Sequence, residues 1–137
     1  MTETVDPREP RYPGLNRAVA AAVDFLGRPS DLTVLINDPQ RHTDSRPVLQ
    51  CLAEDGGVRE MRILVAAGTH RFDATRREAF EQPLAGLPVG EIAWHDSKAN
   101  LVSIGGKWMG HPWLLDPPAV LAIGSVEPHY FAGFTGA

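Results

Sequence analysis

Ionisable side chains follow each of four short apolar segments in the sequence. The segments, at residues 32–36, 63–67, 92–94 and 119–123, are followed in turn by Asp38 and Arg41, His70 and Arg71, His95 and Asp96, and Glu127 and His129. An imidazole can exchange protons near neutral pH or ligate a metal, and a guanidinium can bind a carboxylate or phosphate at two points. The carboxyl ends of parallel strands lie along one edge of an open sheet, so these side chains would converge on one crevice. This pattern predicts a ligand-binding edge.

The spacing of the histidines alone leaves their roles open. His70 and His129 fit proton transfer and loop stabilisation about equally well, whereas a structural or surface role is favoured for His42 and His111. The pair His95–Asp96 fits an oriented imidazole, but an aspartate that opens a loop and caps backbone amides explains it about as well.

Arg41 and Asp38 are candidate ligand-binding residues. Arg41 could bind a carboxylate or phosphate, and Asp38 could orient that guanidinium or a ligand hydroxyl. The alternative is an ion pair within the loop, which in solvent contributes typically under about 1 kcal/mol. Residues 68–69 are a single glycine followed by a threonine, and the sequence contains neither GxGxxG nor GxxxxGK[ST]. Dinucleotide binding of the Rossmann type and P-loop binding therefore have no motif to support them.

Helical segments separate the apolar segments. Apolar residues at three- and four-residue steps predict a helix over 15–26 that ends at Gly27, and Pro47 begins a second amphipathic helix that ends at residues 56–57. Asp73 or Thr75 could cap a third helix that reaches about residue 82.

Continuously apolar strands that alternate with helices predict the fold class. The predicted class is α/β: an open, mostly parallel, Rossmann-like sheet with helices on both faces. We also expect a short strand at 101–104 and a glycine-rich turn at 105–112. Three prolines within residues 1–14 predict an extended leader before the domain.

Composition restricts the class of protein. A chain of 137 residues is about one domain, and its 43% apolar and 22% charged residues are those of an ordinary globular protein. A formal net charge of −4 provides no broad cationic face for nucleic acid. The apolar run at 18–23 is far shorter than the roughly 20 residues of a membrane span, so we expect a cytoplasmic protein. Cys51, the single cysteine, has apolar neighbours and is predicted to lie in the core.

Four motifs occur in the order in which a known family carries them. They are Asn37-Asp38-Pro39-Gln40-Arg41, Ala67-Gly68-Thr69-His70-Arg71, His95-Asp96, and the stretch EPHYFAGFTG at 127–136. From about residue 30 to the carboxyl end, the chain resembles the amino-terminal domain of the nickel-dependent lactate racemase family. The last motif is the specific one, and the others are weak alone.

The resemblance implies an isomerase that holds a nickel-pincer nucleotide. Such an enzyme inverts an α-hydroxy acid by moving a hydride from the substrate carbon to the cofactor and back. His70 and His129 match the family's paired general acid/base histidines, and two are needed because inversion presents the hydroxyl in two places. Arg41 matches the substrate-gripping arginine, with Asp38 beside it. The partner that the resemblance implies is a small hydroxy acid.

The chain also departs from the family pattern. In the family, the glycine-rich loop continues to a lysine that bonds the cofactor, and a later histidine completes the nickel coordination. Neither occurs in these 137 residues, and Lys107 lies in a different loop. We therefore expect residues 15–137 to be an α/β domain truncated before that lysine, inactive by itself, with no metal ligand assigned.

Two other functions remain open from the sequence. The retained crevice is also compatible with a stand-alone binding module or pseudoenzyme. A zinc hydrolase using His70, His95 and His129 is a third possibility, because imidazoles converge at the strand ends. An incomplete sheet would leave an edge unpaired, which favours a homodimer.

Overall fold

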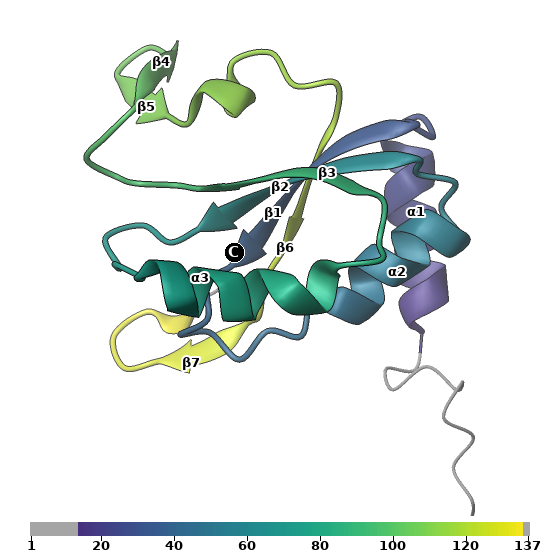
Figure 1. Cartoon of the computed structure of the whole chain (residues 1–137), viewed down its shortest axis with the longest axis horizontal. Helices are drawn as coiled ribbons and strands as arrows, with labels where there is room; N and C mark the ends of the chain where they lie inside the picture. The colour runs from purple at the N-terminus through teal and green to yellow at the C-terminus, as the bar shows by residue number, and fades with distance from the viewer. Residues whose placement is uncertain (1–13, 136–137) are drawn as a thin grey trace, which may run out of the picture.

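The computed structural model describes residues 14–135 (Figure 1). The helices are α1 (Leu15–Phe25), α2 (Arg46–Glu54) and α3 (Ala74–Glu81), with 3-10 turns η1 (Gln82–Leu84) and η2 (Pro112–Leu114). The strands are β1 (Asp31–Asn37), β2 (Glu60–Ala66), β3 (Val89–Trp94), β4 (Val102–Gly105), β5 (Trp108–Gly110), β6 (Val120–Ile123), β7 (Glu127–His129) and β8 (Gly133–Thr135). The predicted leader lies outside the described residues, apart from Gly14.

The main sheet is parallel and has the strand order β3-β2-β1-β6. This confirms the predicted α/β, Rossmann-like class. β1 and β2 pair without a register shift, from Asp31 opposite Glu60 to Asn37 opposite Ala66. The chain order reverses between β1 and β6, and ligands of open α/β sheets bind beyond the carboxyl ends of the strands at such a switch point.

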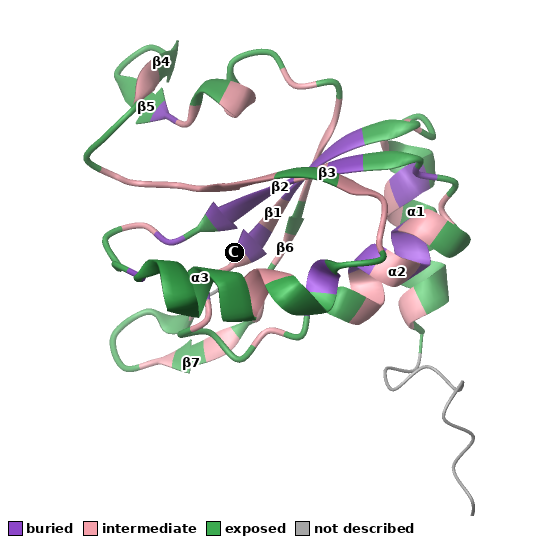
Figure 2. Ribbon diagram, in the orientation of Figure 1, coloured by how far each residue is buried: buried purple, intermediate pink, exposed green. Residues whose placement is uncertain are grey.

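The three α-helices cover one face of this sheet (Figure 1). Alternate residues of the strands point to this face, among them Val34 and Ile36 of β1 and Ile63 of β2, and all three are fully buried or nearly so. They pack against α1 and α2, where Val23 and Leu49 are also buried. Figure 2 shows the buried residues gathered in β1, β2 and the facing sides of these two helices. Removing this apolar surface from water stabilises the position of both central strands.

The opposite face is covered by the segment 96–119 instead of an α-helix, which corrects the expectation of helices on both faces. Its antiparallel β4–β5 hairpin and η2 replace the predicted turn at 105–112. Gly105 and Gly106 adopt positive φ, and prolines at 112, 117 and 118 interrupt any helical run. Arg62 ties this segment to the sheet: its Nε donates to Thr33 Oγ1 at 2.7 Å, and its guanidinium lies 5.0 Å from the Trp113 ring centroid.

Local signals at the ends of the helices are partly confirmed. The Asp73 carboxylate caps α3 by accepting a hydrogen bond from the Arg76 amide at 2.8 Å. Thr75 lies inside the helix, so of the two candidate caps only Asp73 is used.

Cys51 is buried between α1 and α2, as predicted. Burial, together with a hydrogen bond to Asp55, raises the pKa of its thiol to about 11. The thiol is therefore protonated at neutral pH and behaves as a core residue. Within residues 14–135, no helix has the length and apolar character needed to cross a bilayer.

Candidate functional site

At the carboxyl ends of the main sheet, one polar side-chain contact joins each strand to the next: two ion pairs and, between Asp38 and His70, a hydrogen bond. From β3 to β6, the pairs are Arg71–Asp96 at 2.8 Å, His70–Asp38 at 2.6 Å and Arg41–Glu127 at 2.6 Å. The two partners of each pair come from segments that follow two different strands of the sheet. The four loops singled out in the sequence therefore meet along one edge, as parallel strands require.

The Asp38–His70 pair joins the loops after β1 and β2. Asp38 is only 3% exposed, and its Oδ1 accepts a hydrogen bond from the Gln40 amide at 2.8 Å. Its Oδ2 lies 2.6 Å from His70 Nδ1. An ionised carboxylate can only accept, so Nδ1 carries the hydrogen and Nε2 of His70 is left free to take up a proton. The pair thus holds one imidazole in one tautomer.

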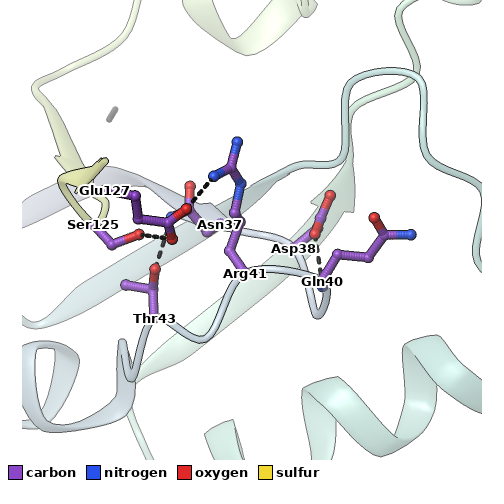
Figure 3. Close-up of polar contacts among 7 residues, drawn as sticks. All are labelled: Asn37, Asp38, Gln40, Arg41, Thr43, Ser125 and Glu127. Carbon is purple, nitrogen blue, oxygen red and sulfur yellow. Dashed lines mark hydrogen bonds and ion pairs between the residues drawn. The ribbon is translucent and has the colours of Figure 1, made fainter. Parts of the chain in front are cut away.

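The Arg41–Glu127 pair crosses the switch point between β1 and β6 (Figure 3). Arg41 Nη1 donates to Glu127 Oε2, and the Ser125 hydroxyl donates to Oε1 at 2.8 Å. The Ser125 hydrogen bond, followed by the Arg41 guanidinium, lowers the pKa of Glu127 below its usual value. The carboxylate is therefore ionised at neutral pH, and it fastens the β7–β8 hairpin to the loop after β1.

The expected partnership of Asp38 with Arg41 is not formed. Their backbones are linked, since the Arg41 amide donates to the Asp38 carbonyl at 3.1 Å. The Asp38 carboxylate turns instead toward Gln40 within its own loop and toward His70. The Arg41 guanidinium pairs with Glu127 instead, and in Figure 3 a dashed line joins it to Glu127 and none joins it to Asp38.

A cavity of about 350 Å³ lies at this edge. Its lining comprises Asn37, Asp38, Arg41, residues 66–70 with His70 at the end, Ser125 and Thr135. Asn37 donates to Thr43 Oγ1 at 2.8 Å, which holds the loop after β1 in place (Figure 3). The volume lies in the range of small-molecule sites, and the convergent polar groups suit a small anionic ligand.

His129 does not line this cavity. It lies at the end of β7, where its ring stacks on Tyr130 with centroids 4.9 Å apart and meets the edge of Phe131 at 4.2 Å. Its Nδ1 accepts hydrogen bonds from the amides of Phe131 and Ala132, both at 3.4 Å. Side chains two apart on a strand share a side, so His129 lies on the side of β7 that carries Glu127. It thus lies on the β7–β8 hairpin that the Arg41–Glu127 pair fastens, and the cavity is lined from this hairpin by Thr135.

The side chains of His95 and Asp96 lie in different surroundings and do not form a pair. The Asp96 carboxylate accepts from the Lys98 amide at 2.8 Å, so the capping alternative is the correct one for this residue. That hydrogen bond, followed by Arg71, lowers the pKa of Asp96. His95 lines a different cavity together with His111.

The zinc-hydrolase interpretation finds no support in the part of the chain that the structure describes. No three or more His, Cys, Asp or Glu side chains are grouped there so as to hold a metal ion. His70 is bound to Asp38, while His95 and His129 belong to separate surroundings.

Comparison with known protein families gives a match over residues 19–137, to the family described as the lactate racemase N-terminal domain. The chain belongs to this family. No curated protein matches the sequence. The match covers the whole sheet and all three side-chain pairs of the lactate racemase N-terminal domain described above.

Two residues of this lactate racemase domain were not assigned a role in the site from the sequence. The sequence shows Glu127 as an ionisable residue of a motif but not as the partner of Arg41, and it gives no sign of the role of Ser125. Only the strand order, which places β6 beside β1, brings the Glu127 carboxylate next to Arg41. That order depends on long-range pairing, which the residue pattern does not contain.

Proposed function

We propose that this chain forms the proton-transfer and carboxylate-binding part of an α-hydroxy acid racemase or epimerase site that works with a nickel-pincer nucleotide. The observation that carries the proposal is that Asp38, His70 and Arg41 line one cavity at the switch point of the sheet. Membership of the lactate racemase family supports the class of reaction.

Arg41 is the carboxylate-binding residue in this proposal. Only its Nη1 is engaged, by Glu127, and its Nε and Nη2 have no hydrogen-bond partner within residues 14–135. A guanidinium with donors to spare can hold a substrate carboxylate at two points while staying anchored by the first pair. A substrate bound there has its α-carbon next to the carboxylate, inside the cavity that His70 also lines.

His70 is the first proton-transfer group. Its Nε2 would accept the proton of the α-hydroxyl as the substrate is oxidised to the planar keto acid, and would return it in the reverse step. The buried Asp38 carboxylate, 2.6 Å from Nδ1, stabilises the imidazolium that forms. Such groups contribute roughly 10²- to 10⁴-fold to the rate.

His129 is the second proton-transfer group, serving the opposite face of the planar intermediate. The support is its match to the family's second histidine and its place on the hairpin that the Arg41–Glu127 pair fastens beside the cavity. The arginine that binds the carboxylate therefore also sets the position of the second imidazole.

The nickel-pincer nucleotide would supply the hydride acceptor when bound. Among residues 14–135 there is no group of three or more ligating side chains that could hold a metal ion without the nucleotide. The chemistry of these residues suits the substrate's oxygens, so the proposal assigns to residues 14–135 only carboxylate binding and movement of the hydroxyl proton.

The proposal is tested by titrating L- and D-lactate into the full ¹⁵N-labelled chain and following the amide resonances. We expect both enantiomers to shift the amides of Asp38, Gln40, Arg41 and residues 68–70 at millimolar concentration, and Arg41→Gln to abolish these shifts. Arg28→Gln is the matched control, because Arg28 forms an exposed ion pair with Asp24 before the amino end of β1, whereas the site lies beyond its carboxyl end. Absence of shifts at saturating lactate, or shifts that Arg41→Gln leaves intact, contradicts the proposal.

A further inference from the structure

A second cavity, of about 180 Å³, lies between the sheet and the segment 96–119, on the face opposite the α-helices. Its lining comprises Leu35, Leu64, Ala66, His95, Ile104, Met109, Gly110, His111 and Leu114. The cavity is thus mainly aliphatic, with two imidazoles. Nothing in the proposed reaction uses it.

The second cavity adjoins the first along the two central strands. On β1, Leu35 lies two residues before Asn37, and on β2, Leu64 lies two residues before Ala66. Side chains two residues apart on a strand point to the same face of the sheet, so Leu35 shares a face with Asn37, and Leu64 with Ala66. Asn37 lines the first cavity, Leu35 and Leu64 line the second, and Ala66 lines both. A ligand held at the carboxyl edge can therefore extend back along this face.

The second cavity is lined by apolar side chains that remain exposed to water and by a polar atom without a hydrogen-bond partner among the described residues. Ile104 and Met109 are 39% and 55% exposed, so their apolar surface still faces water. His95 Nδ1 is buried and has no hydrogen-bond partner among the described residues. The corresponding nitrogen of His111 accepts from the Trp113 amide at 3.2 Å. An unpaired buried polar atom is unfavourable, so His95 favours a ligand that brings a hydrogen-bonding group.

We infer that the substrate is an α-hydroxy acid with an aromatic substituent, whose ring occupies the second cavity and carries a polar group for His95. The inference rests on the proposed function, because Arg41 must hold the carboxylate. The volume is sufficient: a dry apolar cavity of about 150 Å³ accommodates benzene. The methyl group of lactate would leave the second cavity unfilled.

The test measures dissociation constants for lactate, phenyllactate and 4-hydroxyphenyllactate with the full chain, by calorimetry. We expect phenyllactate to bind at least about tenfold more tightly than lactate, since each added carbon in an apolar pocket contributes appreciably. We expect 4-hydroxyphenyllactate to bind more tightly still. Leu114→Phe fills the cavity and should remove the preference, whereas the neighbouring Leu115→Phe, at a residue that does not line it, should keep it.

Wild-type protein provides a second readout that does not depend on the folding of a variant. Nuclear Overhauser effects between the ring protons of phenyllactate and the methyl groups of Leu114 and Leu35 are expected. Equal affinity for lactate and phenyllactate, with both lost in Arg41→Gln, overturns this inference and leaves the proposed function standing. Failure of all three acids to bind removes the proposed function as well.

Discussion

Asp38 and His70 follow neighbouring parallel strands and meet with 2.6 Å between Oδ2 and Nδ1. The contact is set by the register of the sheet, because β1 and β2 end opposite each other at Asn37 and Ala66. The rigid strands thereby position a buried acceptor against an imidazole that is partly exposed in the cavity. An arrangement of this kind directs the basic nitrogen of the histidine toward a ligand.

The tautomer of His70 should depend on Asp38. Both Asp38 oxygens accept hydrogen bonds, and the partner of Oδ1 is the Gln40 amide, which can only donate. In Asp38→Asn the amide oxygen must therefore face Gln40 and the NH₂ must face His70. This forces the ring hydrogen from Nδ1 to Nε2.

Long-range ¹H–¹⁵N correlation spectra of the histidine rings check this prediction. Asp96→Asn is the control, because Asp96 accepts a backbone amide in the same way but pairs with Arg71. An unchanged His70 tautomer in Asp38→Asn would show that the contact does not orient the ring.

The negative charge of Glu127 should oppose the binding of an anionic substrate at Arg41. Its carboxylate occupies Nη1 at 2.6 Å, so Glu127→Gln removes an anion next to the site and leaves the guanidinium fully charged. The variant is expected to bind lactate up to about fivefold more tightly, a modest effect because the Glu127 carboxylate is solvent-exposed and its charge is screened. Calorimetric titration measures the change, with Glu78→Gln on α3 as the control. Weaker binding by Glu127→Gln would mean that the carboxylate assists the ligand.

Stability should fall on acidification because of His111. Burial, aided by the nearby His95 and Arg62, lowers the pKa of His111 below its ordinary value of 6.5. A depressed pKa means that the neutral ring is favoured in the folded state, so the stabilisation is present above pH 6.5 and is lost as the pH falls through the lowered pKa.

The substitution His111→Asn isolates this effect. Asparagine can still accept the Trp113 amide at the start of η2 but does not titrate. Between pH 7.5 and 5.5, the melting temperature of the wild type is expected to fall further than that of the variant. Parallel melting curves would contradict the assignment.

The core between α2 and the sheet should tolerate little loss of volume. Leu49 is 0% exposed and packs against the strands, so Leu49→Ala is expected to lower the free energy of unfolding by about 2–5 kcal/mol. Phe25→Ala, at a residue that is 90% exposed, should change it by less than about 0.5 kcal/mol. Urea denaturation measures the free energy of unfolding of both variants. A small loss in Leu49→Ala, similar to that in Phe25→Ala, would indicate a loosely packed core.

The sequence predicts the parallel sheet well, because β1, β2 and β6 each contain a mainly apolar run of four or more residues. In β3, Gly90 and Glu91 limit that run to residues 92–94. The sequence also places Asp38 and His70 at one edge, since that follows from parallel strands alone. The segment 96–119 is less predictable: its hairpin and 3-10 turn depend on contacts of Arg62 with Thr33 and Trp113, residues far apart in the sequence.

The pairing of charged side chains at the site is the least predictable feature. Asp38 and Arg41 are neighbours in the sequence, and yet each binds a residue from another loop. Local spacing favours a pair within the loop, whereas the strand order and the turn around Gln40 decide the actual partners. The place of His129 likewise depends on the β7–β8 hairpin, which continuous apolar patterning does not reveal.

A crystal structure of the full chain soaked in lactate tests the central claim most directly. We expect the carboxylate on the Arg41 guanidinium and the α-hydroxyl within hydrogen-bond distance of His70 Nε2. Lactate bound away from both residues, or a cavity that stays empty at a concentration that saturates the chain in solution, would contradict the account.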